Sequence, residues 1–479
     1  MIPQNKVLIL FVMIMFFFSG CIYSSKIPPL AVKQPSEKLI CIKNITVFTG
    51  DADQEVIENA DILIKDDRIE KIGKFPVPET DCRIIDGAGK MVIPGLIDHH
   101  IHINAPGAPP WFPVLPNRNL IDRNLSAFLY AGITTVFDMG GPSGDLKETK
   151  ERIEADETLN PRFFYAGKVF TAKGGHPDWM VRELVPWPVD AFLIKQIAFL
   201  VESPDDIAPA IAQNKALGAS LTKIMVDQIP LGVPSLYETL IADIVTESDR
   251  AGLVVGSHIG SESDLLTGLN SGVRFFCHAP YRSSVSDSTI AAMKEKQAVI
   301  IPTLVVFEYS AQFFKDALEF NRFDKQIIDP QILDAYLSVP GGGLDADDPR
   351  MESWIHDLLT YQDIKYESVR KMKNAGIPII AGSDSPNIAT VAGASLHTEM
   401  RLLVEKCGFT PAEAVAAATS VSGDMLARTT GVKGLGRIRE GGPADLLILN
   451  EDFRDDITRT ETIFMVISNG RIVNRHPSK

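Results

Sequence analysis

Short apolar runs alternate with longer amphipathic stretches from residue 92 to residue 427. Eight runs are predicted to be strands, and in chain order they read MVIPGLIDHHIHI, ITTVFDM, RFFYAG, SLTKIMVD, GLVVGSH, VRFFCH, AVIIPTL and IPIIAGSD. Their near-continuous apolar character is typical of strands in a parallel sheet, which helices bury on both faces. Eight such strands alternating with helices predict an α/β fold, a (β/α)8 TIM-like barrel.

Two shorter β-rich segments, residues 38–91 and 428–479, flank this pattern. The first contains LICIKNITVFTG and ADILIKDDRIEKIGK, and the second contains ADLLILN and IFMVISNGRIVNR. Asn469-Gly470 in the last of these is a strong signal for a tight hairpin. Each segment is too small to hold a core alone, so we expect both chain ends to pair into one small β-sandwich domain.

The first 20 residues are predicted to be a signal peptide. Lys6 precedes the apolar run VLILFVMIMFFF, which is too short to span a membrane and fits the core of an export signal. The stretch from Phe18 to Cys21 resembles a bacterial lipobox, with Phe18 where leucine is usual. The resemblance implies cleavage before Cys21 and a lipid on its sulfur. Residues 21–37 then form a tether.

This N-terminus predicts that the protein is exported and anchored to a membrane by its lipid. Ile22 after the cysteine indicates the outer membrane in a cell that has one, and otherwise the cell surface. An uncleaved N-terminal anchor is the alternative.

Composition and charge narrow the classes of partner. The 479 residues are 45% hydrophobic and 23% charged, with a net charge of −14. A negative protein lacks the field that attracts nucleic acid, so we expect no such partner and keep a small-molecule substrate open. A homo-oligomer is also left open. The cysteines other than Cys21 are scattered, which predicts neither a disulfide framework nor a cysteine zinc site.

Three histidines stand at the end of the first predicted strand. On an extended strand His100 and His102 share one face, whereas His99 points to the other. Neutral imidazole is the commonest side-chain metal ligand, and two on one rigid strand supply half of a metal site. The alternative is that these histidines are ordinary polar residues at the end of a strand.

Other predicted strands also end in groups that bind metal or protons. His258 ends the fifth run, His278 ends the sixth and Asp384 ends the eighth. In barrels of this type the chemistry lies at the carboxyl ends of the strands, so these side chains are site candidates. Lys223 lies within the fourth run, where a bare buried ammonium would be costly.

The order of these residues resembles the amidohydrolase superfamily, closest to its imidazolonepropionase-like and prolidase-like branch. Landmarks of that family are similar to VIPGLIDHHIH, AGITTVFDMGG, AGSDS and LGRIREGGPADLLIL here, and the resemblance covers about residues 38–476. It implies two divalent ions, with zinc favoured. One ion would be held by His100, His102 and Asp384, the other by His258 and His278, and a Lys223 carboxylated by carbon dioxide would bridge both.

The chemistry that follows is hydrolysis of a carbon–nitrogen bond in a small amide, cyclic amide or dipeptide-like substrate. Two such ions can hold a bridging hydroxide at neutral pH and polarise a carbonyl, and Asp384 would be the group that shuttles a proton to the leaving amine. The same cage also suits lactones, esters and phosphotriesters. A noncatalytic lipoprotein that binds solute or metal is a further alternative.

The sequence says less about which residues contact the substrate. His176, in a glycine-rich loop, stands where this branch commonly has a substrate-contacting histidine, and a surface role is the alternative. Tyr281 and Arg282 follow His278, and the guanidinium of Arg282 would suit a substrate carboxylate. A salt-bridged rim is the alternative role for this pair. Trp111 and Phe112 are candidate apolar walls, and His397 is a candidate for a supporting role near the metals.

Overall fold

A computed structural model describes residues 32–33, 37–51, 54–76, 82–109, 112, 118–155, 160–338 and 349–475. The predicted signal peptide, Cys21, Trp111 and His476 lie outside these residues. Within the described part, no helix has the length and apolar character needed to cross a membrane.

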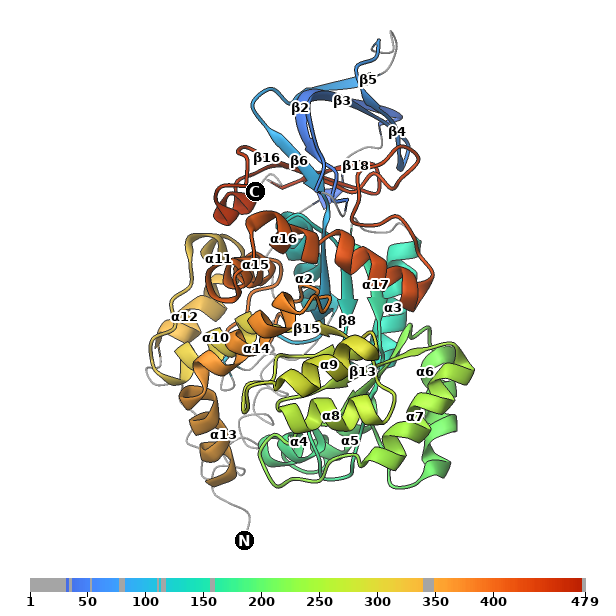
Figure 1. The fold of residues 1–479 in the computed structure, drawn as a ribbon, viewed down its shortest axis with the longest axis vertical. Helices are drawn as coiled ribbons and strands as arrows, with labels where there is room; N and C mark the ends of the chain where they lie inside the picture. Colours follow the sequence, from blue (N-terminus) through green and yellow to red (C-terminus); the bar gives the residue numbers. More distant parts are fainter. Residues whose placement is uncertain are drawn as a thin grey trace, which may run out of the picture.

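Both ends of the chain contribute strands to one nine-stranded sheet, drawn in blue and red at the top of Figure 1. Its order is β1-β18-β17-β16-β6-β2-β3-β4, with β5 paired to β2. The strands are β1 (Val32–Lys33), β2 (Leu39–Phe48), β3 (Val56–Lys65), β4 (Arg68–Gly73), β5 (Cys82–Asp86), β6 (Met91–Pro94), β16 (Leu446–Leu449), β17 (Ile463–Ser468) and β18 (Arg471–Asn474). The junction of the two ends is the antiparallel pair of β6 and β16.

The turn between β17 and β18 requires backbone that glycine and asparagine favour. Asn469 has φ 51° and Gly470 has φ 72°, the left-handed values of a two-residue hairpin turn. A Cβ on Gly470 would lie 1.8 Å from the carbonyl oxygen of Asp66, so only glycine fits against the neighbouring hairpin.

The rest of the described chain is a mixed α/β unit with two parallel sheets. One sheet has the order β7-β8-β9 and the other β11-β10-β12-β13-β14-β15. Their strands are β7 (Leu96–Ile101), β8 (Ile133–Asp138), β9 (Arg162–Tyr165), β10 (Val169–Thr171), β11 (Ala198–Leu200), β12 (Leu221–Met225), β13 (Val254–His258), β14 (Phe275–Cys277) and β15 (Val299–Ile301). Seven of the predicted runs thus contain a parallel strand, and the short strands β10 and β11 were not predicted.

Helices follow most of these strands and lie outside them (Figure 1). The helices between strands are α2 (Arg118–Tyr130), α3 (Ser143–Glu154), α4 (Asp178–Leu184), α5 (Val189–Ile197), α6 (Ile207–Ala216), α7 (Glu238–Ala251), α8 (Glu262–Asn270) and α9 (Asp287–Glu295). After β15 come α10 (Leu304–Phe314), α11 (Arg322–Ile327), α12 (Pro330–Ser338), α13 (Pro349–Thr360), α14 (Gln362–Asn374), α15 (Ala394–Cys407), α16 (Pro411–Ala417) and α17 (Ser420–Thr430).

The eighth predicted strand is present only as isolated bridges. Ile379 bridges Ile300 of β15, and Ser385 bridges Ile101 of β7, both in the parallel sense. The ladder is short because Pro378 has no N–H to donate, and because Asp384 turns to φ 57°. The described strands therefore do not form one continuous closed sheet, and the closed barrel stays a prediction.

Hydrogen bonds nonetheless join the two parallel sheets through this segment and through β9. The Ile380 N–H donates to Ile300 O at 2.9 Å, and the Asp384 N–H donates to His100 O at 2.7 Å. On the other side, the Ser220 N–H donates to Tyr165 O at 2.8 Å. Apolar side chains from both sheets meet in one buried cluster, which includes Ile97, Phe137, Leu221, Phe275, Ile301 and Ile380. The strands thus face a common interior, and the candidate site lies at one end of it.

Candidate metal centre

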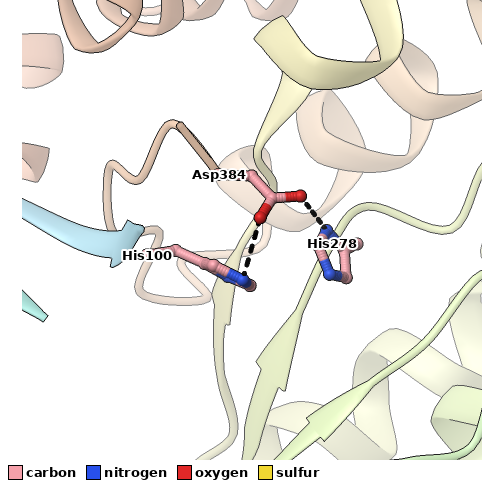
Figure 2. Close-up of side chains that lie close together, drawn as sticks. All are labelled: His100, His278 and Asp384. Carbon is pink, nitrogen blue, oxygen red and sulfur yellow. Dashed lines mark ion pairs between the residues drawn. The ribbon is translucent and has the colours of Figure 1, made fainter. Parts of the chain in front are cut away.

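Asp384 lies between histidines from two different strands, as Figure 2 shows. Its Oδ1 is 3.4 Å from His100 Nε2, and its Oδ2 is 4.0 Å from His278 Nδ1. One ligand atom from each of the three residues lies within 4.8 Å of the others, close enough to hold one ion. His102 Nε2 also lies 3.1 Å from Asp384 Oδ1. A single carboxylate therefore faces three predicted ligands.

The remaining predicted ligands lie against this group. The rings of His258 and His278 have centroids 4.1 Å apart, and those of His100 and His278 are 4.8 Å apart. Lys223, two residues before the β12 residue that pairs with His258, is 2% exposed. The structure thus brings together all six side chains that the sequence analysis assigned to the metal site.

Polar atoms lie beside one ring nitrogen of three of these histidines. His102 Nδ1 is 2.9 Å from Gly140 O, and His278 Nδ1 is 2.7 Å from Thr303 Oγ1. For His258 the contact is on the other nitrogen, because its Nε2 lies 3.6 Å from Asp227 Oδ2. Partners of this kind set the tautomer and orientation of metal-binding imidazoles. They leave Nε2 of His102 and His278, and Nδ1 of His258, for the site.

Several buried polar atoms at the centre have no hydrogen-bond partner among the described residues. They are both ring nitrogens of His100, Nζ of Lys223 and Oδ1 of Asp384. Buried polar atoms without partners cost free energy, so a group that binds all of them is expected here. Imidazole nitrogen and carboxylate oxygen are ligands that suit zinc and similar divalent ions, so the residues fit a metal centre.

His100 and His278 are held in the neutral form that binds metal. Burial lowers the pKa of His100 and of His278 well below the usual value, and nearby cationic groups add to the effect. Burial also lowers the pKa of His102, but its contact with Asp384 outweighs that effect and the pKa is raised overall. The neutral imidazoles of His100 and His278 can coordinate an ion without first losing a proton.

His99 is directed away from the metal cluster, as the strand alternation predicts. Its ring stacks on Phe137 with centroids 5.3 Å apart, and it meets Phe275 edge-on at 5.9 Å. Burial lowers the pKa of His99 to about 3, so the ring is neutral and packs as a core side chain.

Two carboxylates beside the site were missed by the sequence analysis. Asp98 accepts hydrogen bonds from the hydroxyl of Ser383 at 2.5 Å and from its N–H at 2.9 Å. Asp138 accepts from the N–H groups of Ile103 at 2.7 Å and Gly140 at 2.9 Å. Burial raises the pKa of Asp98 to about 7 and that of Asp138 to about 6. Asp138 ends its apolar run, so the strand-end rule that selected His258 would have found it.

A third missed carboxylate, Asp227, lies between His258 and Arg282. It is fully buried, and its Oδ1 accepts a short hydrogen bond from Arg282 Nη1. The Arg282 side chain also lies 3.7 Å from Asp357 of α13 and donates to Gln228 O at 2.8 Å. Burial alone would raise the pKa of Asp227, but His258 and Arg282 lower it overall. Arg282 therefore forms the ion pair that was the alternative to a substrate contact.

Tyr281 belongs to an aromatic wall beside His278. Its ring is 5.0 Å from Phe307, which in turn meets His278 edge-on at 5.9 Å. Its hydroxyl accepts a hydrogen bond from Trp354 Nε1 of α13 at 3.2 Å. Tyr281 is 2% exposed, and burial raises its pKa well above the usual value. This side of the site is thus apolar and neutral.

The other predicted residues divide between the site and the core. The ring of His176 lies 5.3 Å from that of His258, and burial lowers its pKa to about 3. Phe112 packs against the main core. His397 lies apart from the metal cluster, since its ring nitrogens contact Thr460 Oγ1 at 3.0 Å and Ala131 O at 2.9 Å. The supporting role near the metals expected for His397 is therefore not seen in its contacts.

Comparisons with known proteins agree with this geometry. The amidohydrolase family profile matches residues 91–300 and 357–473. Ochratoxinase from Aspergillus niger is 22% identical over 460 residues, covering 90% of this chain and 85% of that protein. A prolidase solved with N-methylphosphonate-L-proline is 25% identical with a TM-score of 0.72, covering 91% of this chain and all of that one.

A shorter match is to dihydroorotase from Clostridioides difficile, 42% identical over 122 residues, which is 26% of this chain. This match spans 25% of the dihydroorotase, so it concerns about a quarter of that protein. The family profile covers well over half of the described chain and includes five of the predicted metal-site residues before residue 300 and Asp384 after residue 357. The chain belongs to the amidohydrolase family, and it is a hydrolase that acts on carbon–nitrogen bonds.

Proposed function

We propose that this protein is a metal-dependent amidohydrolase that cleaves an amide, cyclic amide or dipeptide-like bond in a small substrate. The observation that carries the proposal is the convergence of four histidines, Asp384 and a buried Lys223 whose Nζ has no described partner. A binding protein would need ligands for a metal, but it would not need a carboxylate placed to exchange protons with a leaving group.

The residues would hold two divalent ions, with zinc favoured by the ligand types. His100, His102 and Asp384 would hold one ion, and His258 and His278 the other. Lys223 would bridge them after carboxylation, which converts its buried, unpartnered amine into an anionic oxygen ligand. When bound, the ions would supply Lewis acidity toward the substrate carbonyl and lower the pKa of water.

Asp384 would move the proton in this reaction. Its carboxylate lies within 3.4 Å of two histidine nitrogens on one strand, so it is fixed at the centre of the cluster. We propose that it accepts a proton from the attacking water and returns it to the amine that leaves. Thr303 and Gly140 would keep the rings of His278 and His102 oriented during this step.

The substrate would present an uncharged group to the wall made by Tyr281, Phe307 and Trp354. Arg282 is neutralised by Asp227 and Asp357, so it supplies no free positive charge on this side. His176, beside His258, is the proposed polar contact to the substrate. Ochratoxinase and prolidase, the names of two relatives, support an amide or dipeptide-like bond as the target.

Turnover by an Asp384→Asn variant tests this function. A proton-shuttling carboxylate acts on the transition state, so kcat on a panel of amides and dipeptides should fall by about 10²- to 10⁴-fold, with KM changed far less. Asp424→Asn, which removes an exposed carboxylate paired with Arg437, is the matched control and should keep wild-type kcat. Equal turnover by Asp384→Asn would remove Asp384 from the mechanism, and a wild type that hydrolyses nothing would contradict the function.

We further propose that the eight strand segments close into a (β/α)8 barrel, with its β domain built from both chain ends. The boundaries proposed for the barrel are residues 92 and 427. We also propose that Cys21 carries the lipid that anchors the exported protein to a membrane.

A further inference from the structure

A pocket separate from the candidate metal centre lies beside helix α2. Its empty volume, counted together with the open solvent at its mouth, is about 440 Å³. Its walls come from α2, from residues 106–107 after β7, from residues 327–332 at the end of α11 and the start of α12, and from residues 386–392 after the Asp384 segment. None of its described lining residues is a predicted metal ligand.

Arg123 of α2 forms a charged part of this pocket's wall. The residue is 8% exposed, and burial lowers the pKa of its guanidinium to about 10. Its Nη2 donates a short hydrogen bond to Ile327 O, the last carbonyl of α11. Its Nε has no hydrogen-bond partner, and Arg123 forms no ion pair with any carboxylate in the described chain.

A purely structural role explains only part of this arrangement. A cation near the C-terminus of a helix is stabilised by the helix dipole, so the Nη2 bond to Ile327 is a favourable cap. A buried charge without a counter-ion nevertheless costs several kcal/mol. A guanidinium also has more N–H donors than the bond to Ile327 uses. A planar guanidinium matches a carboxylate with two parallel hydrogen bonds.

The other polar groups of the pocket are already engaged. Asn124 Nδ2 donates to Ile103 O at 3.0 Å and to Ala105 O at 3.2 Å. Asp329 Oδ1 accepts a hydrogen bond at 2.8 Å from the N–H of Gln331 in the first turn of α12, where a helix N-terminus favours negative charge. The remaining wall is largely apolar.

We propose that this pocket binds a small monocarboxylate with an apolar body, whose carboxylate pairs with Arg123. The apolar body would contact side chains such as Ile328, Ile332 and Val391, which also line the pocket. Because the pocket shares no residue with the proposed metal ligands, occupancy does not depend on the proposed reaction. The ligand would contact the loops that follow His102 and Asp384.

Photoaffinity labelling of the purified enzyme with para-azidobenzoate tests this site. We expect adducts on α2 or on residues 327–332 and 386–392, identified by mass spectrometry of the digested protein. Benzoate should protect these peptides at a concentration about tenfold lower than benzamide, which has the same shape without the charge. Arg118→Gln, an exposed arginine of the same helix paired with Glu148, is the matched control and should label as the wild type does.

Arg123→Gln should lose the labelling and the protection by benzoate. If that variant does not fold, Arg123→Lys keeps the charge but not the planar fork, and benzoate should then protect about tenfold less well. Equal labelling in the Arg123 variants, equal protection by benzamide, or adducts confined to peptides of the metal centre would each overturn the proposal. The function of Arg123 would then be to cap α11. None of these results depends on turnover, so the proposed hydrolase function is tested separately.

Discussion

Ser383 donates its hydroxyl hydrogen to Asp98 Oδ2 at 2.5 Å, and this bond ties β7 to the segment that carries Asp384. The same carboxylate accepts the Ser383 N–H at 2.9 Å and the His100 N–H at 3.3 Å. Both residues are fully buried. The bond thus fixes the segment of His100 and His102 relative to the segment of Asp384.

Removing this bond should loosen the metal centre while leaving the protein folded. For Ser383→Ala we expect metal affinity to fall by about 10- to 100-fold, the usual cost of losing a group that orients ligands. Competition with a chelator measures the affinity, and circular dichroism checks the fold. Ser284→Ala, which removes a hydroxyl from the part-exposed pair with Glu367, should bind metal as the wild type does. Unchanged affinity in Ser383→Ala would show that the Ser383 hydroxyl does not help to position the proposed ligands.

The buried pair of Asp227 and Arg282 predicts a large and non-additive effect on stability. Asp227→Asn leaves the guanidinium of Arg282 buried with its nearest carboxylate 3.7 Å away, so unfolding free energy should fall by about 3–5 kcal/mol. In the double variant with Arg282→Met, part of that loss should be recovered.

Urea denaturation of both single variants and the double variant measures this coupling. Asp452→Asn, which breaks the more exposed pair with Arg454, should cost less than about 1 kcal/mol. Strictly additive losses at Asp227 and Arg282 would contradict the role given to the pair.

Because His397 is buried, we expect the unfolding free energy of the protein to fall in acid. Burial lowers its pKa from 6.5 to about 4, with a smaller opposing contribution from the Ala131 carbonyl. Between these values the unfolded chain binds a proton that the folded protein does not, so unfolding free energy falls as pH falls through this window. Its full contribution is present above about pH 6.5, and up to about 3 kcal/mol is lost by about pH 4.

His397→Gln should remove that part of the pH dependence, because glutamine does not titrate. The measurement is unfolding free energy in urea at about pH 7 and about pH 4.5 for each protein. The exposed His356→Gln is the matched control and should follow the wild type. A slope in His397→Gln as steep as that of the wild type would assign the acid sensitivity to other groups.

The lipid anchor predicts incorporation of labelled palmitate into the wild-type chain expressed in a bacterium. Cys21→Ser should take up no label and should appear in the soluble fraction. Cys82→Ser, a change at a part-exposed cysteine of the β domain, should be labelled as the wild type is. Label in Cys21→Ser would place any lipid elsewhere.

The sequence predicted seven of the parallel strands and the residues that meet in the candidate metal centre because both depend on local pattern. Apolar runs give the strands, and the polar residue after each run marks the end at which a site forms. The two-residue period of a strand alone separates the core ring of His99 from the rings of His100 and His102 in the candidate metal centre.

The contacts that support those residues could not be predicted, because they join segments far apart in the chain. Asp98 meets Ser383 across 285 residues, and Arg282 meets Asp227 across 55. The sequence leaves both a substrate contact and a salt-bridged rim open for Arg282, and its ion pair with the buried Asp227 favours the second. The eighth strand was predicted from its apolar run, whereas its short ladder follows from Pro378, which has no N–H to donate, and from the φ of 57° at Asp384.

Anomalous diffraction from crystals of the purified enzyme, collected on both sides of the zinc absorption edge, tests the metal centre most directly. We predict two peaks, one bounded by His100, His102 and Asp384 and the other by His258 and His278, with added density joining Lys223 Nζ to both. The proposed centre would be contradicted if crystals of enzyme that hydrolyses an amide gave no peak at these residues. A Lys223 amine that contacts no metal would contradict it as well.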